Sequence, residues 1–328
     1  MDPHDTTTIL APVPQDTEYF SILDNSLMRA RAIIQLVSGA VSLLGLGANI
    51  VNVVVFTRQG FSESINVSLL GLAVSDMLTL VNMFPFTLIS WFEWTDSWAW
   101  YAFAFNSSWI AVFISVERCL CVKVPMKVKD IITPKVAAVV IILMFLLTLT
   151  SIVPSFIAFE AKRSWDPSRN KTVFKLVPKE NKVLLEFITY CMLAFMQNGS
   201  FICLLFSTAI LIFTLKQKSD WRLQATVTKS VASVAALRRD NQVVKMVILV
   251  STIIVLSYLP GQCLSLAAMI VPDSFYAKLP RHMFKFLWAV AFSQYAVNAS
   301  INIFIYYNMS SKYKATLLAI VKEWGVSG

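Results

Sequence analysis

Long apolar stretches separated by short polar segments are the main pattern along this chain. Seven stretches carry at most one charged residue each, at residues 32–57, 64–92, 97–116, 136–159, 187–215, 246–272 and 286–311. About 20 helical residues cross roughly 30 Å of hydrocarbon, so each stretch is long enough to span a membrane. Barrel strands show instead about ten residues of alternating hydrophobicity. The pattern predicts an all-α membrane protein with a seven-transmembrane helix bundle.

The segments on either side of this bundle predict the domain organisation. Residues 1–31 are polar and form an N-terminal segment, residues 32–311 form the membrane domain, and residues 312–328 form a short C-terminal segment. In the C-terminal segment, helical spacing brings apolar residues to one side, as in an amphipathic eighth helix lying at a membrane surface. These residues are Tyr313, Leu317, Leu318 and Val321.

Composition and charge agree with a protein held in a lipid bilayer. Hydrophobic residues make up 57% of the chain and charged residues only 14%, a balance too apolar for a soluble domain. The net charge of +9 at pH 7 fits contacts of helix-flanking Lys and Arg with anionic headgroups. No soluble basic domain remains to bind nucleic acid. Basic residues in the loops favour a multi-pass topology with the N-terminus outside, although both sides are basic.

Cysteines and sequons bear on the outer loops. All five cysteines fall within or at the ends of the predicted spans, so none is available for a disulfide between outer loops. Several Asn-x-Ser/Thr triplets lie inside spans. Asn170, in the Asn-Lys-Thr of the long outer loop, is the candidate for glycosylation.

Asp76 is the one charged residue within the central spans. An ionisable group at this depth costs about 2.5 to 3.5 kcal/mol, so Asp76 is a candidate functional residue. The alternative is a carboxyl group held by neighbouring hydroxyls for packing alone. In the last span, Asn298, Asn302 and Tyr306 are spaced four apart and share one helix face.

Five motifs in order give the sequence a family resemblance. They are "GANIV" with Asn49, "LAVSD" with Asp76, "ERCLCVKVP" directly after the third span, "SYLPG" with Pro260, and "NASINIFIYY" in the seventh. With these motifs the chain resembles rhodopsin-class (class A) G-protein-coupled receptors across residues 32–324. It is most similar in character to invertebrate, especially molluscan, orphan, peptide or chemosensory-type receptors, in which Glu-Arg-Cys replaces Asp-Arg-Tyr.

The resemblance implies a coupling site at the cytoplasmic end of the third helix. Glu117 would hold Arg118 in the inactive state, and Arg118 would become a contact for a heterotrimeric G protein. Asp240 stands where the family often places a second acid that locks the arginine, and Tyr306 belongs to the same region. The alternative is an ion pair that only snorkels at the membrane edge.

The same comparison implies an ion site and a ligand pocket. Asp76, Ser107, Asn298 and Asn302 match positions that surround an allosteric sodium ion in many members, with a network of water alone as the alternative. No other cofactor is expected. Pocket candidates in the outer halves of the helices are Trp91, Trp100, Tyr258, Gln262, Trp288, Phe292 and Tyr295. Membrane aromatics also pack or form interfacial belts. Trp100 stands where amine receptors carry an aspartate, so we do not expect a biogenic amine.

The chain also departs from the family pattern. Ile303 replaces a proline that kinks the seventh helix. The separation of Asp76 and Arg118 is about ten residues shorter than usual, and Glu93 stands where the disulfide cysteine of the third helix is expected. We expect that a segment has been lost, and the alternative is a connection native to this lineage.

We therefore expect a plasma-membrane receptor without enzymatic activity. It would transduce an extracellular ligand, a neuropeptide or a chemosensory cue, to a heterotrimeric G protein. One alternative is a transporter or channel with Asp76 on a permeation path, which would require inverted repeats and broken helices. Another is a non-signalling, shortened receptor isoform.

Overall fold

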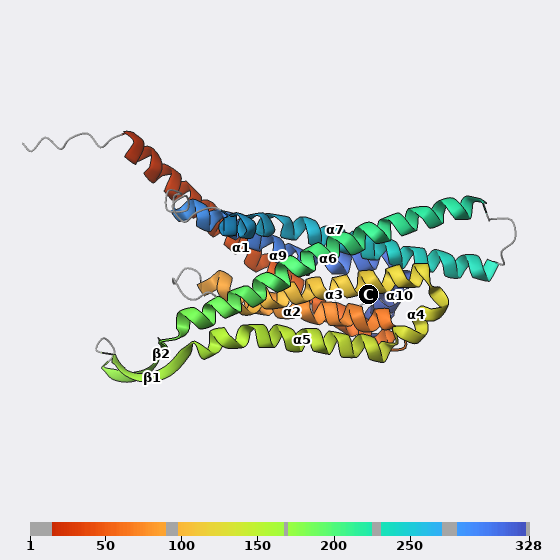
Figure 1. Cartoon of the computed structure of the whole chain (residues 1–328), viewed down its shortest axis with the longest axis horizontal. Coiled ribbons are helices and arrows are strands. Elements are labelled where there is room, and N and C mark those ends of the chain that lie inside the picture. Colours follow the sequence, from red (N-terminus) through yellow and green to blue (C-terminus); the bar gives the residue numbers. More distant parts are fainter. Residues whose placement is uncertain (1–14, 90–97, 167–169, 225–230, 271–280, 326–328) are drawn as a thin grey trace, which may run out of the picture.

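The computed structural model describes residues 15–89, 98–166, 170–224, 231–270 and 281–325. Long helices dominate this part of the chain (Figure 1). The helices are α1 (Gln15–Gln59), α2 (Ser64–Ile89), α3 (Trp98–Lys123), α4 (Pro125–Ile131), α5 (Pro134–Ile157), α6 (Lys182–Gln224), α7 (Val231–Ile270), α9 (Arg281–Met309) and α10 (Ser311–Glu323). The strands are β1 (Phe159–Asp166) and β2 (Lys171–Pro178).

The long helices lie side by side along one axis, with the β-hairpin at one end of the bundle and α4 at the other (Figure 1). Helix α3 is central, because it contacts α2, α5, α6 and α7. Its buried face includes Ala102, Phe105, Ile110 and Ile114. Helix α1 packs on α2 and α9, and α10 returns to contact both α1 and α9.

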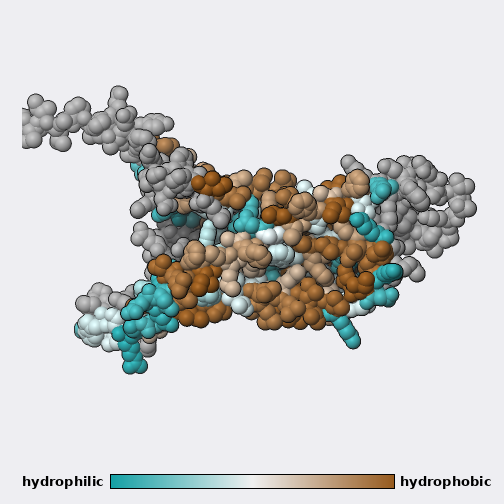
Figure 2. Space-filling model, viewed as in Figure 1, coloured by the Kyte–Doolittle hydropathy of each residue, from teal (hydrophilic) through white to brown (hydrophobic). Residues whose placement is uncertain are grey.

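The outer surface of the bundle is apolar, as a lipid solvent requires. Large side chains such as Leu147, Phe206 and Phe304 are each about two-thirds exposed. Figure 2 shows hydrophobic residues over the middle of the bundle and hydrophilic residues toward its ends. Soluble proteins rarely expose apolar patches of this extent. The surface therefore fits the hydrocarbon layer of a membrane.

Five helices of the described chain are long and apolar enough to cross a membrane, namely those containing Ile22–Gln59, Ser64–Phe84, Pro134–Ile157, Lys182–Thr214 and Gln242–Ala267. Helices α3 and α9 are as long, with 26 and 29 residues, but carry more polar side chains. Many of those polar groups, such as Asn106, Ser115 and Asn302, are buried in the interior of the bundle. The predicted seven-helix bundle is confirmed.

Several helices extend beyond the predicted spans. Helix α1 begins at Gln15 rather than at residue 32, and α6 continues to Gln224 rather than ending at residue 215. Hydropathy marks only the part of a helix that contacts hydrocarbon. Polar residues at a helix end can continue the same hydrogen-bonded coil into water.

The expected outer loop contains a β-hairpin that the sequence did not predict. Strands β1 and β2 pair antiparallel from Phe159 opposite Pro178 to Asp166 opposite Lys171. Asn170 lies beside the turn, is exposed, and has a φ of 47°. Asn adopts this left-handed conformation more readily than most residues. The candidate glycosylation residue is therefore accessible at the edge of the hairpin.

Helix α10 confirms the expected C-terminal helix but orients it differently. The Ser310 side chain accepts a hydrogen bond from the Tyr313 backbone N–H at 3.2 Å and caps its start. Tyr313 and Ile320 are buried against the bundle, whereas Leu318 is 51% exposed. The apolar side was expected to hold Leu318 with Tyr313. Packing against α1 and α9 instead selects Tyr313 and Ile320, and leaves Leu318 and Val321 exposed.

None of the five cysteines forms a disulfide, as the sequence predicts. Helix α2 ends at Ile89 and α3 begins at Trp98. The connection between them, which contains Trp91 and Glu93, lies outside the described residues. The hypothesis of a lost segment therefore stays a prediction.

Candidate functional site

A buried carboxylate, Asp76, lies at the centre of the bundle and is 1% exposed. The Nδ2 of Asn302 on α9 donates a hydrogen bond to the Asp76 Oδ2 at 2.7 Å. Ser107 on α3 lies beside this carboxylate, and its hydroxyl donates a hydrogen bond to the Phe103 backbone carbonyl at 3.3 Å. The hydrogen bond between Asn302 and Asp76 joins α2 to α9, and Ser107 brings α3 to the same place. The sodium or water site that was expected there stays a prediction.

Asn298, one turn before Asn302, has a buried Oδ1 without a hydrogen-bond partner among the described residues. A buried oxygen in this condition requires an explanation, such as a water or an ion. The carboxylate of Asp76 and the oxygens of Ser107 and Asn298 are the donor types that a hard cation prefers. The residues fit a small cation, and they also fit ordered water.

The C-terminal half of α3 ends in an ion pair. The Arg118 Nη2 lies 2.5 Å from the Glu117 Oε1. The Ser64 hydroxyl, at the start of α2, donates a hydrogen bond to the same Glu117 oxygen. Glu117 is fully buried, and the Arg118 side chain is only 13% exposed. The predicted pairing of Glu117 with Arg118 is present, and Ser64 is a partner that the sequence analysis missed.

Two other residues of the predicted coupling site have different outcomes. The side chain of Asp240 lies outside the described part of the structure, so its pairing with Arg118 stays a prediction. Tyr306 is buried, and its ring packs against Phe56 at 5.3 Å and Tyr313 at 5.6 Å between centroids. Its hydroxyl has no hydrogen-bond partner among the described residues.

Polar contacts that the sequence did not predict link α3 to its neighbours. The hydroxyls of Ser115 and Ser251 lie 2.9 Å apart and connect α3 with α7. Asn106 on α3 donates to the Ser75 hydroxyl at 3.0 Å and accepts from the Thr148 hydroxyl at 3.1 Å. Asn106 belongs to one of the Asn-x-Ser/Thr triplets that lie inside the predicted spans. An Asn buried in a span, away from any glycan, was the signal of a structural role.

A cavity of about 350 Å³ lies between α3, α6, α7 and α9. Its described lining is strongly aromatic, with Tyr and Phe from α3 and a row of rings on α9. Neutral polar side chains from α6 and α7 form the other wall. The lining residues are Tyr101, Phe105, Tyr190, Leu193, Ala194, Gln197, Asn198, Ser265, Phe284, Trp288, Phe292 and Tyr295. Cavities of this size, with few polar groups, typically hold small ligands or side chains of larger ones.

The cavity contains three of the predicted pocket residues, Trp288, Phe292 and Tyr295. Two others lie just behind the wall. Tyr258 packs on Tyr295 at 4.5 Å between ring centroids, and its hydroxyl donates to the Ala104 carbonyl at 2.8 Å. Gln262 donates to the Asn198 Oδ1 at 2.5 Å. These two residues position lining residues rather than line the cavity themselves.

The remaining two predicted pocket residues cannot be placed in the cavity. Trp91 lies outside the described residues, and Trp100 belongs to α3 with a side chain that is not described. The sequence analysis also missed the α6 wall, formed by Tyr190, Gln197 and Asn198. Helix α6 is apolar on most sides, so its pattern does not indicate which face meets α3.

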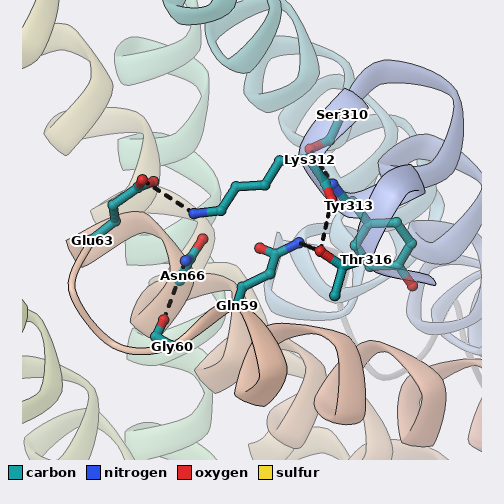
Figure 3. Close-up of polar contacts among 8 residues, drawn as sticks. All are labelled: Gln59, Gly60, Glu63, Asn66, Ser310, Lys312, Tyr313 and Thr316. Atoms are coloured by element: carbon teal, nitrogen blue, oxygen red, sulfur yellow. Dashed lines mark hydrogen bonds and ion pairs between the residues drawn. The ribbon is translucent and has the colours of Figure 1, made fainter. Parts of the chain in front are cut away.

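The end of the bundle opposite the β-hairpin has a smaller cleft, of about 40 Å³, where α10 returns to the connection between α1 and α2. Figure 3 shows Lys312 extending toward Glu63 and Gln59 toward Thr316. The Lys312 Nζ lies 3.1 Å from the Glu63 Oε1. The Gln59 Nε2 lies 3.4 Å from the Thr316 hydroxyl. Residues far apart in sequence thus close this end of the bundle.

Seven long helices packed around a central α3, with an apolar outer surface, form the fold of a G-protein-coupled receptor. Residues 36–323 match the family described as "Serpentine type 7TM GPCR chemoreceptor Srw". This match covers most of the chain, and the chain belongs to that family. It is therefore a multi-pass membrane receptor. Membership of this family also decides against an enzyme and against the transporter or channel alternative.

A curated relative supports the same class. The chain is 26% identical over 132 residues to the "Galanin-like G-protein coupled receptor npr-9" of Caenorhabditis elegans. The similar region covers 37% of this chain and 31% of that receptor. The chain therefore spans about a third of the length of this relative.

Proposed function

We propose that the protein is a plasma-membrane receptor, with its N-terminus outside, that transmits binding of an extracellular ligand to a heterotrimeric G protein. The observation that carries this proposal is that α3 connects two sites. Tyr101 and Phe105 line the cavity near one end of α3, and Glu117 and Arg118 form the buried ion pair near the other. The 13 residues from Phe105 to Arg118 span about 20 Å at the rise of an α-helix.

The two sites can communicate by a shift of population. A ligand favours whichever arrangement of the helices binds it more tightly. In the described arrangement Arg118 is held by Glu117, and Glu117 is also held by Ser64. A ligand that favours displacement of α3 relative to α2 would weaken the Ser64 contact and release Arg118 for a G protein.

The cavity wall supports a particular ligand chemistry. Its described lining contains seven aromatic residues and no Asp, Glu, Lys, Arg or His. A charge placed there would be removed from water without a partner, which is strongly unfavourable. Gln197, Asn198 and Ser265 offer neutral hydrogen bonds opposite the rings of α9. We therefore propose an uncharged aromatic group with a polar substituent, carried by a peptide or by a small chemosensory molecule, rather than a biogenic amine.

We also propose a sodium ion as an allosteric ligand at Asp76. The carboxylate supplies charge, while Ser107 and Asn298 offer neutral oxygens. Among the described residues, Asp76 forms no ion pair with a Lys or Arg. A bound cation would supply the missing positive charge. Asn302, which donates its amide to the carboxylate, would keep the Asp76 side chain oriented.

The orientation proposal rests on the β-hairpin. Asn170 is exposed at the hairpin edge, at the same end of the bundle as the start of α3 (Figure 1). Glycans are transferred to Asn on the side of the membrane that later becomes the outer side, so a glycan on Asn170 would place this end outside. The cavity and the hairpin would then face the ligand, and α4 and α10 would face the cytoplasm.

Two measurements in cells test this function. Dissociation of each class of heterotrimeric G protein is recorded while the receptor is exposed to three sets of compounds: uncharged aromatic peptides, uncharged aromatic small molecules, and biogenic amines. We expect activation by a compound from the first two sets, with loss of that response in Phe292→Ala. Activation by amines alone would contradict the proposed ligand class. Responses that persist in Arg118→Ala would contradict coupling through α3.

A further inference from the structure

Tyr313 on α10 forms a buried hydrogen bond with Asn52 on α1. The Tyr313 hydroxyl donates to the Asn52 Oδ1 at 2.6 Å. Asn52 is fully buried, and Tyr313 is 1% exposed. An Asn buried in a membrane-spanning helix needs such a partner, because an unsatisfied amide in this environment is unfavourable. The two residues are 261 positions apart in the chain.

This bond continues into the bundle as a chain of polar contacts. The Asn52 Nδ2 donates to the Asn49 Oδ1 at 3.2 Å. The Asn49 Nδ2 donates in turn to the Ala299 carbonyl of α9 at 2.6 Å. Ala299 lies next to Asn298 and three residues before Asn302, the partner of Asp76. A continuous path of hydrogen bonds therefore runs from α10 through α1 to α9.

Aromatic packing fixes the Tyr313 ring in the same place. Its centroid lies 5.5 Å from that of Phe56 on α1 and 5.6 Å from that of Tyr306 on α9. Burial raises the pKa of the Tyr313 phenol above its ordinary value, so the hydroxyl keeps its proton and remains a donor. The ring and the hydroxyl thus hold α10 against two different helices.

Other contacts of α10 are more exposed. Three pairs connect it to the end of α1 and to the following turn, namely Glu63–Lys312, Gln59–Thr316 and Arg58–Glu323. In the two ion pairs the side chains are between 33% and 59% exposed. Exposed ion pairs contribute little, because water and salt screen them. Figure 3 shows two of these pairs at the edge of the cleft.

We propose that the hydrogen bond from Tyr313 to Asn52 positions α10. Through this bond, the position of α10 depends on how α1 packs against α9. Tyr313 and Asn52 are positioning residues, because they act through the arrangement of α1, α9 and α10. Their bond belongs to the arrangement in which Glu117 holds Arg118. Loss of the bond therefore loosens α10 and shifts the receptor away from this arrangement. The effect on signalling rests on the proposed receptor function, whereas the positioning of α10 does not depend on it.

The first test is a double-mutant cycle read by hydrogen exchange of the full-length receptor in detergent. Tyr313→Phe keeps the ring and removes the hydroxyl, so we expect the amides of residues 311–323 to exchange roughly two- to tenfold faster, the range of a single hydrogen bond. In an Asn52→Leu background, Tyr313→Phe should cause no further increase, because the hydroxyl has already lost its acceptor. Tyr307→Phe is the matched control, since Tyr307 is exposed on α9.

The second test is basal G-protein activation per receptor at the cell surface. We expect Tyr313→Phe to raise it by roughly two- to tenfold and Tyr307→Phe to leave it unchanged. Equal acceleration of exchange by Tyr313→Phe in both backgrounds would overturn the proposed bond. Faster exchange without a change in signalling would overturn the coupling to the bundle and leave the receptor function intact. Failure of receptor function would appear as absent signalling in the unmutated protein.

Discussion

Glu117 and Arg118 form an ion pair although they are consecutive residues of one helix. Side chains at positions i and i+1 point in different directions around a helix, so this contact requires Arg118 to fold back toward Glu117. The Glu117 Oε2 and the Arg118 Nε are buried without hydrogen-bond partners among the described residues. The two residues are therefore paired, but each still has one polar atom that can form a hydrogen bond with a new partner.

The Ser64 hydroxyl is the contact from α2 that stabilises this pair. Ser64→Ala should remove one hydrogen bond to the Glu117 carboxylate, which typically contributes about 1.5 to 3 kcal/mol. We predict higher basal G-protein activation, by about tenfold, in cells with equal surface expression. Ser68→Ala is the control, because the Ser68 hydroxyl bonds only to the Ser64 backbone carbonyl. Unchanged basal activity in Ser64→Ala would show that the α2 contact does not restrain Arg118.

A sodium ion at Asp76 predicts salt-specific signalling. Replacing potassium by sodium at constant ionic strength should lower basal activity, because the ion stabilises the arrangement that binds it. Asp76→Asn removes the charge and should abolish the difference, while the buried site keeps its size. The measurement is nucleotide exchange by a G protein in membranes. Equal activity of the unmutated receptor in both salts would favour a network of water alone.

The aromatic wall of α9 predicts the location of ligand binding. Phe292 contacts Tyr101 edge-on at 5.1 Å between ring centroids and packs on Trp288 at 5.1 Å. Phe292→Ala should reduce the potency of an agonist by at least about tenfold, the typical effect of losing a buried aromatic contact. Phe304→Ala is the matched control, because Phe304 is two-thirds exposed on the outer surface of α9. A similar loss in both variants would place the ligand elsewhere.

Asn170 gives a test of topology and of the short connection before α3. We predict a glycan on Asn170 that Asn170→Gln removes, seen as a shift in electrophoretic mobility. If a segment has been lost between α2 and α3, this glycan should stay immature and surface labelling should be low. A version with a lengthened connection should then mature more efficiently. Efficient delivery of both versions would mean that the short connection is native.

The features that sequence predicted well are those with local signals. Hydropathy located the spans, and four-residue spacing placed Asn298 and Asn302 on one face of α9. The grouping of Asn302 with Asp76 and the pairing of Glu117 with Arg118 were expected from the family resemblance, because the motifs that contain them match those of class A receptors.

Other features depend on which helix faces meet, and sequence does not specify this. Ser64 lies 53 residues from Glu117, and nothing around it distinguishes it from other helix-start serines. The α6 wall of the cavity was missed because α6 is apolar nearly all round. The β-hairpin was missed because its strands lie in a polar outer segment without clear alternation. Tyr313 was expected to face lipid, and its bond to Asn52 required knowledge of how α10 returns to α1.

The most direct test of the account is G-protein activation by Arg118→Ala. The receptor and this variant are expressed to equal surface density, and nucleotide exchange is measured with and without an activating compound. The account predicts normal surface expression and ligand binding, with agonist-stimulated exchange reduced to the level of cells without receptor. Full stimulation of exchange by Arg118→Ala would contradict the central claim that α3 transmits the signal through this arginine.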